Sequence, residues 1–231
     1  MIGIIGAMEE EVNQLKEAMK DVSAETRASM EFCRGKLEGA DVVVVRSGIG
    51  KVNAGICAQI LADVYHVDQI INTGIAGSLQ AEINIGDIVL STDALQHDMD
   101  ARAFGYPEGQ IPRMETLSFQ ADERLIACAG ECCRRVNPDI GVFQGRVLSG
   151  DQFIADRKKK EWLKETFGGC CTEMEGAAIG QAAYLNGIPF LIIRAISDKA
   201  DDSASMDYPE FEAKAIAHTT ALVKAMVKEL H

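Results

Sequence analysis

The sequence has few positively charged residues. Among 231 residues there are 23 lysines and arginines against 35 aspartates and glutamates, which gives a formal net charge of −12. Outside Arg157–Lys160 the sequence holds no cluster of basic side chains. Because proteins bind nucleic acids by neutralising backbone phosphates, this charge balance argues against a DNA or RNA partner.

Long hydrophobic runs are absent as well. No stretch approaches the roughly 18 to 20 apolar residues that a membrane-spanning helix needs. The chain starts with a short apolar segment, Ile2–Ile5, which is followed by acidic residues and not by a signal-peptide pattern with a basic leader and a cleavage site. We therefore expect no membrane partner and a cytoplasmic location.

Histidine is scarce and the cysteines are poorly spaced for a metal or a disulfide framework. The seven cysteines are an odd number and include the adjacent pairs Cys132-Cys133 and Cys170-Cys171, not Cys-x-x-Cys motifs. A zinc site needs better ligand spacing, such as Cys-x-x-Cys, with nearby histidines, and a chain of this size needs no disulfides to fold. We expect reduced thiols and no bound metal. The four histidines are scattered: His66, His97, His218 and His231.

With 47% apolar residues, the chain can bury a complete core, and we expect one α/β domain over residues 1–231. Its centre is the apolar run 190–193, which lacks polar alternation and so predicts a strand covered on both faces. Arg194, Ser197 and Asp198 follow at the edge where open α/β sheets bind small molecules. From this run alone, Asp198 could equally cap the next segment or pair with Lys199.

Other predicted strands also end in glycine or acidic residues. After residues 2–5 the chain breaks on Gly6 and enters a helix whose first turn holds Glu9, Glu10 and Glu11. These acids could simply complement the helix dipole, yet they would also repel a phosphate at a turn that normally attracts one. The turn at Gly48–Gly55 resembles a dinucleotide fingerprint only in part. Residues 68–78 predict a strand followed by a loop of small residues, which would allow a ligand close to the backbone.

The remaining pattern predicts a hairpin, further helices and a long loop. Residues 93–118 show little periodicity, and a loop of that length is typical of a functional segment or an interface. Glu173 and Glu175 flank Met174 at a strand-to-helix junction, where we expect only one carboxylate to point into a cleft. The polar segment 199–207 could order over a ligand. The predicted hairpin joins 30–37 to 41–47, and helices are predicted at 9–19, 50–65, 121–136, 157–167 and 208–230.

Six motifs occur in order along the whole chain: Gly6–Glu11, Ser47–Val52, Asn72–Gly74, Ser149–Ile154, Glu173–Glu175 and Arg194–Asp198. Together they closely resemble those of the bacterial 5'-methylthioadenosine/S-adenosylhomocysteine nucleosidases. This resemblance implies a nucleoside phosphorylase-like α/β fold, with a mixed, partly barrel-like central sheet surrounded by helices, in a homodimer. It also implies hydrolysis of the N-glycosidic bond of methylthioadenosine, S-adenosylhomocysteine and 5'-deoxyadenosine in methionine salvage and methyl-cycle recycling, with neither metal nor organic cofactor.

The same resemblance assigns roles to individual residues. It makes Asp198 the acid that protonates adenine N7 and Glu11 the base that activates water. Ile75 departs from the family, since many relatives carry a serine there that helps to hold the water. The implied substrate-binding residues are Glu175 and Met174 at the ribose, Phe153 and Ile154 at adenine, Arg194 and Ser197 as supports, and Met8, Ile49 and Tyr208 at the 5' group, with Phe104 and Pro112 from the partner subunit.

Two other functions compete with this interpretation. A purine nucleoside phosphorylase shares the fold but needs cations or free amides for phosphate, whereas the first loop offers three glutamates and the Asn72 strand end lacks the arginine of the phosphorylases. A noncatalytic nucleoside-binding protein would bind without turnover. That reading gives no reason for Glu11, Glu175 and Asp198 to occur together.

Overall fold

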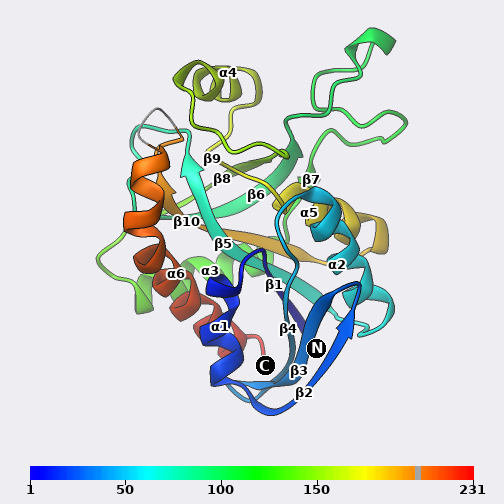
Figure 1. Cartoon of the computed structure of the whole chain (residues 1–231), viewed down its shortest axis with the longest axis vertical. Helices are drawn as coiled ribbons and strands as arrows, with labels where there is room; N and C mark the ends of the chain where they lie inside the picture. Colours follow the sequence, from blue (N-terminus) through cyan, green and yellow to red (C-terminus); the bar gives the residue numbers. More distant parts are fainter. Residues whose placement is uncertain (201–203) are drawn as a thin grey trace.

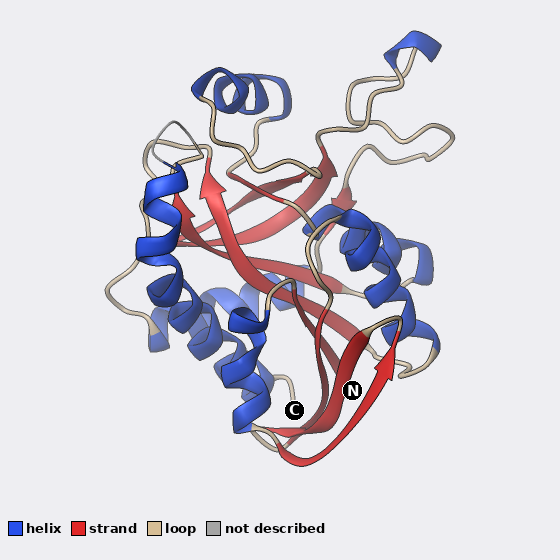
Figure 2. Cartoon of the chain, viewed as in Figure 1, coloured by secondary structure: helices blue, strands red, loops and turns tan. Residues whose placement is uncertain are grey.

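A computed structural model describes the backbone of residues 1–200 and 204–231 and the side chains of residues 1–200 and 211–231. In that part of the chain a mixed sheet is flanked by helices on both sides (Figures 1 and 2). The strands are β1 Ile2–Gly6, β2 Lys20–Arg27, β3 Met30–Leu37, β4 Ala40–Arg46, β5 Gln69–Ser78, β6 Ile88–Gln96, β7 Phe119–Gln120, β8 Val142–Ser149, β9 Cys171–Glu173 and β10 Phe190–Asp198. The helices are α1 Glu9–Ala18, α2 Lys51–Asp63, the short 3-10 helix η1 Arg102–Phe104, α3 Glu123–Val136, α4 Arg157–Phe167, α5 Gly176–Asn186 and α6 Ala204–Glu229.

Five of the strands close on themselves. β10 pairs with β5 in parallel and with β6 antiparallel, β6 and β8 are parallel, β8 and β9 are parallel, and β9 returns antiparallel to β5. This closure leaves no free edge among the five strands. The expected mixed, partly barrel-like sheet is thereby confirmed.

The rest of the sheet extends from β5. β1 lies parallel to both β5 and β4, and the predicted hairpin is confirmed as the antiparallel pair β3 and β4. No sequence pattern predicted β2, whose eight residues are all exposed and which pairs only with β3 among the described strands. Main-chain bonds to β3, and not a buried face, hold this polar edge strand in place.

Helices cover the two sides of the sheet in separate groups. α1, α3 and α6 pack together on one side, and α2 packs against α5 on the other (Figure 1). α4 spans the predicted residues 157–167 and buries Leu163 and Phe167, with Trp162 packed edge-on against Phe167. Trp162 packs against a small hydrophobic cluster and lies outside the main cavity.

Two predicted boundaries are wrong. β5 continues to Ser78 where a loop of small residues was expected, and β6 runs to Gln96, four residues into the segment 93–118 that showed little periodicity. β5 stays extended because β10 pairs with it as far as Gly77, and β9 pairs with its last residues. Pairing on both sides outweighs the weak strand preference of glycine and asparagine.

Several expectations concern regions or properties beyond the sheet. No helix of the described residues is long and apolar enough to cross a membrane. The segment expected at 199–207 falls partly outside the described residues, as does the side chain of Tyr208, although α6 begins at Ala204. A single domain over 1–231 stays a prediction, which the sheet shared by N- and C-terminal strands supports.

Candidate active site

A cavity of about 270 Å³ lies beside β5, between the ends of β1, β9 and β10. A smaller space of about 30 Å³ adjoins it and shares Phe153 and Asp198 with it. Four carboxylates line the cavity wall, and no lysine, arginine or histidine among the described residues lines it with them. The described lining residues are Ala7, Met8, Glu11, Ile49, Ile75, Ala76, Gly77, Phe153, Thr172, Glu173, Met174, Glu175, Ser197 and Asp198.

Glu11 lies in the first turn of α1 and turns its carboxylate back toward the end of β1. Oε2 accepts hydrogen bonds from the amides of Ala7 at 2.7 Å and Met8 at 3.0 Å, while Oε1 accepts from the amide of Ile75 at 3.2 Å. Burial raises the pKa of Glu11 above the usual value for glutamate, although Arg194 and the three amides act in the opposite direction. Glu11 is therefore a stronger base than an exposed glutamate, held in one orientation.

Asp198 is the last residue of β10 and is almost completely buried. Its Oδ2 accepts a hydrogen bond from Ser197 Oγ at 2.9 Å, and its Oδ1 accepts from the amide of Ala200 at 2.7 Å. The arrangement orients the carboxyl group on the cavity wall. The bond from Ala200 shows that Asp198 also caps the start of the following segment, one of the two alternatives considered from sequence. For the other alternative, Lys199 Nζ donates to the carbonyls of Ala81 and Ile83.

Two glycines of β5 make room for these carboxylates. A Cβ atom on Gly74 would lie 2.5 Å from Glu11 Oε1, and one on Gly77 would lie 2.7 Å from Asp198 Oδ1. Both distances are shorter than real contacts allow. The small residues of 72–78 thus leave space for two carboxylates of the protein itself. The sequence pattern had instead predicted that this space admits a ligand.

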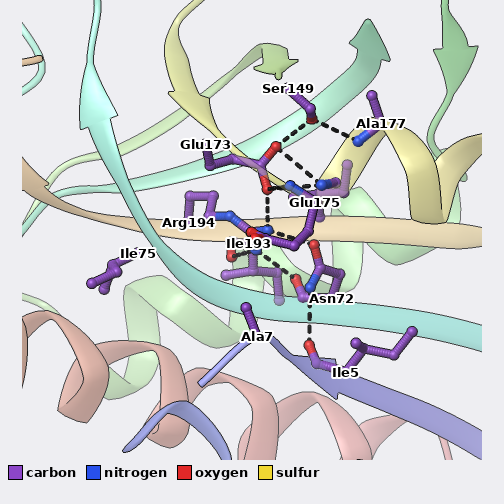
Figure 3. A network of polar contacts seen from close by, with 12 residues as sticks. Ile5, Ala7, Asn72, Ile75, Ser149, Glu173, Glu175, Ala177, Ile193 and Arg194 are labelled. Atoms are coloured by element: carbon purple, nitrogen blue, oxygen red, sulfur yellow. Dashed lines mark hydrogen bonds and ion pairs between the residues drawn. The ribbon is translucent and has the colours of Figure 1, made fainter. Parts of the chain in front are cut away.

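Arg194 is fully buried and connects several strands (Figure 3). Its Nη2 donates to Asn72 Oδ1 at 2.6 Å and to Glu173 Oε2, and Nη1 donates to the carbonyl of Ile193 at 3.1 Å. Burial alone would lower the pKa of Arg194, but the carboxylates around it raise the pKa above its usual value. The guanidinium therefore stays charged and neutralises part of the acidic site.

Glu175 borders the cavity at the N-terminus of α5. Its Oε1 accepts a hydrogen bond from the amide of Gly50 at 2.8 Å, which joins the glycine-rich turn before α2 to this wall. Burial, followed by the nearby charge of Glu173, raises the pKa of Glu175 to about 8. The predicted support of Glu175 by Arg194 is indirect. The guanidinium donates a hydrogen bond to Glu173, whereas it acts on Glu175 through its charge.

The remaining predicted residues fall into three groups. Met8, Ile49, Phe153 and Met174 line the main cavity, and Ile154 lines the adjoining space. Phe104 and Pro112 are exposed and lie outside both walls.

Sequence reasoning missed two polar lining residues, Glu173 and Thr172. The expectation that only one of Glu173 and Glu175 would reach the cleft is wrong, because both line it. The strand ends at Glu173, and Glu175 lies at the helix start, so the alternation of an extended chain does not apply. Thr172 also lines the cavity, and its hydroxyl has no hydrogen-bond partner among the described residues. Its place at the end of a strand was the available signal.

Metal coordination finds no support in this geometry. Among the described residues, no three histidine, cysteine, aspartate or glutamate side chains are arranged to hold an ion. The carboxylates of Glu11 and Glu173 are instead engaged by hydrogen-bond donors of the protein. The chemistry that the site offers is proton transfer between carboxyl groups and a small molecule held against Phe153 and Met174.

Known proteins resemble this chain over its full length. Residues 1–228 match the sequence model of a family described as the Phosphorylase superfamily. The 5'-methylthioadenosine/S-adenosylhomocysteine nucleosidase of Shewanella halifaxensis is 42% identical over 230 residues, which cover 99% of each chain. The structure of the Neisseria meningitidis nucleosidase with methylthio-immucillin-A has a TM-score of 0.95 at 37% identity, covering 99% of this chain and 98% of that one.

A second solved structure carries a different ligand. The nucleosidase of Colwellia psychrerythraea 34H, in complex with adenine, has a TM-score of 0.95 at 38% identity and covers 99% of this chain and 95% of that one. The sequence matches and the structural matches therefore both cover nearly the whole chain. The chain belongs to the 5'-methylthioadenosine/S-adenosylhomocysteine nucleosidase family within the phosphorylase superfamily.

Proposed function

We propose that the protein hydrolyses the N-glycosidic bond of 5'-methylthioadenosine and S-adenosylhomocysteine, releasing adenine and the corresponding 5'-thioribose. The names and bound ligands of its relatives support this substrate class. One observation carries the proposal: two buried carboxyl groups, Glu11 and Asp198, line the same cavity and are held by separate sets of hydrogen bonds. Glycoside hydrolysis divides its proton transfers between two such groups.

In the proposed reaction Asp198 gives its proton to N7 of adenine. The bond between N9 and the ribose C1' breaks with its electron pair moving to the base, and the sugar becomes oxocarbenium-like. A water molecule forms the new bond to C1' and gives a proton to Glu11. A positioned acid or base contributes about 10² to 10⁴-fold to the rate.

The other site residues bind the substrate in this scheme. Glu175 accepts or donates hydrogen bonds at the ribose hydroxyls, and Met174 packs on the sugar. Phe153 stacks on adenine, and the backbone of Ile154 contacts its edge. Arg194 and Ser197 support the carboxylates, and Met8, Ile49 and Tyr208 form the pocket for the 5'-thio group. The presence of Phe153 and Ile154 around two connected spaces supports their assignment to one ligand.

We expect water, and not phosphate, to attack the sugar, for an electrostatic reason. The amides of Ala7 and Met8, at the strand-to-helix turn that would attract an anion, are already bound to Glu11. A phosphate there would meet this carboxylate with no cation on the described cavity wall to offset the repulsion. This occupied turn distinguishes the site from that of a phosphorylase.

The identity of the sugar product tests the proposal. We expect methylthioadenosine to yield adenine and methylthioribose at the same rate with and without inorganic phosphate, as measured by chromatography and mass spectrometry. A sugar 1-phosphate that appears only with phosphate would identify a phosphorylase instead. Binding of the nucleoside without release of adenine would identify a noncatalytic binding protein.

We also propose that the protein acts as a homodimer. The paired helices α2 and α5 expose Val52, Ile56 and Leu185, the first at 73% and the last at 66%, beside a groove of about 440 Å³. Apolar side chains gathered on one face are typical of an interface. In the dimer, Phe104 and Pro112 of one subunit close the 5' pocket of the other, which explains why Phe104 is 83% exposed in the single chain.

A charge on this face should separate the subunits. We expect Leu185→Glu to shift the mass measured by light scattering from dimer to monomer, because it would bury an unpaired carboxylate. Loss of the partner's contribution to the 5' pocket should raise KM for methylthioadenosine by at least about 10-fold, corresponding to about 1.4 kcal/mol. Val136→Glu, on α3 and outside this face, is the matched control and should remain dimeric. A monomeric wild-type protein with full activity would contradict the dimer.

The state of the cysteines supports the proposed cytoplasmic location. All seven thiols are free. Burial raises the pKa of the Cys133 and Cys171 thiols above the usual value, so these groups stay protonated and unreactive. Free thiols of this kind are usual in a reducing compartment.

A further inference from the structure

Glu173 and Glu175 lie two residues apart but receive very different numbers of hydrogen bonds. Glu173 accepts from four groups: the hydroxyl of Ser149, the guanidinium of Arg194, and the amides of Glu175 and Gly176 at the start of α5. Among the described residues, Glu175 accepts from the amide of Gly50 alone. The donors of this region, including the guanidinium of Arg194, are therefore directed at Glu173 and not at Glu175.

The environment of Glu173 is itself fixed on several sides (Figure 3). Ser149 Oγ also accepts from the amide of Ala177 at 2.7 Å, so its own hydrogen is directed at Glu173. Arg194 is held by Asn72, whose Nδ2 donates to the carbonyl of Ile5 at 3.0 Å. The chain of contacts from β8 to β1 therefore has one arrangement of donors and acceptors, in which Glu173 is acceptor only.

We propose that Glu173 is a positioning residue that engages Arg194 and the amides at the start of α5, and thereby keeps Glu175 protonated in the unliganded enzyme at neutral pH. The idea rests on the proposed function, because Glu175 is the group assigned to the ribose. A protonated Glu175 presents one O–H donor and an acceptor oxygen to the sugar hydroxyls, whereas an ionised one can only accept. Glu173 thus acts on the substrate through Glu175 without touching it.

The groups around Glu175 are consistent with a protonated carboxyl group at this position. Glu11 faces it from α1, Glu173 from β9 and Arg194 from β10, and Asp198 lines the same cavity. The turn before α2 contributes a backbone amide, while Lys51 at the start of that helix is paired with Asp98 at 2.5 Å. The pKa of Glu175 is raised to about 8, first by burial and then by Glu173. Two neighbouring carboxylates cannot both ionise readily.

Glu173→Gln tests the role of the charge. Glutamine keeps an acceptor oxygen of similar shape but frees the guanidinium of Arg194 for Glu175. We expect the midpoint of the Glu175 titration to fall by at least about one unit, as followed by carboxyl NMR of protein labelled with ¹³C-glutamate. The alkaline limb of kcat/KM for methylthioadenosine should move by the same amount. The resonance and the limb are assigned to Glu175 by their loss in Glu175→Gln.

Glu173→Asp, which retains the carboxylate, should restore a midpoint near that of the wild type. A midpoint unchanged in Glu173→Gln, or lowered equally in Glu173→Asp, would overturn the proposal. If Glu173→Gln does not fold, the wild type decides: no glutamate carboxyl titrating above about 7 would refute it, since an ordinary glutamate titrates near 4.3. The NMR titration needs no turnover, so failure to release adenine would reject the proposed function while leaving this test intact.

Discussion

Asp198→Asn should lower the turnover of methylthioadenosine by at least about 10²-fold while leaving the fold intact. The amide cannot supply the proton that adenine needs as it leaves. The substitution is otherwise conservative in this site, since an asparagine Oδ1 can still accept from the amide of Ala200, and Ser197 Oγ can accept from the new amide group. Initial rates of adenine release at saturating substrate measure the effect.

A substrate that needs no acid separates catalysis from binding. We expect Asp198→Asn to retain near-normal turnover of a p-nitrophenyl riboside carrying the 5-methylthio group, because that leaving group departs without a proton. Asp139→Asn, at an exposed position, is the matched control and should behave as wild type on both substrates. Near-normal adenine release by Asp198→Asn would show that another group is the acid.

Glu11→Gln should also reduce turnover by at least about 10²-fold, but with the opposite substrate pattern. Glutamine cannot accept a proton from water, so both the nucleoside and the p-nitrophenyl riboside should be hydrolysed slowly. In the wild type, kcat/KM should fall as the pH drops through the pKa of Glu11. Because burial raises that pKa, the fall should begin at a higher pH than for an exposed glutamate.

The stability of the Glu11→Gln variant needs a separate measurement. Its side-chain amide would meet the backbone N–H of either Ile75 or Ala7 and Met8, so one donor would face another. We expect a loss of about 1–3 kcal/mol in the free energy of unfolding, partly offset by removal of a buried charge. Glu10→Gln, exposed on the same turn, should alter neither activity nor stability. Full activity in Glu11→Gln would remove Glu11 from its role.

Most secondary structure could be predicted because local pattern decided it. α4 and β3 match their predicted limits, and α1 ends one residue before its predicted end. The elements that failed lack a local signal: β2 is mostly polar and exposed throughout, and the second half of β5 consists of small residues apart from Ile75. Both are strands because neighbouring strands supply their main-chain partners, which one segment of sequence cannot reveal.

The same distinction holds within the candidate site. The acids at the ends of β9 and β10 were visible from sequence, since the carboxyl ends of buried strands are where ligands bind. The different environments of Glu173 and Glu175 could not be predicted from the sequence. They depend on Ser149, Arg194 and Gly50, which come from three other parts of the chain. Only the folded structure brings these residues together. Among the described residues it gives Glu173 four donor groups and Glu175 a single amide.

The sequence by itself determined the family, the α/β class and the set of acidic residues available for chemistry, because these depend on the order of residue types along the chain. Only the tertiary structure decided that the amides of Ala7 and Met8 are occupied by Glu11, that Gly74 and Gly77 give carboxylates the space of a missing side chain, and that burial and the neighbouring Glu173 raise the pKa of Glu175. The physical reason is that burial, hydrogen bonding and charge act over a few ångströms, and closure of the barrel brings together residues that are more than a hundred positions apart.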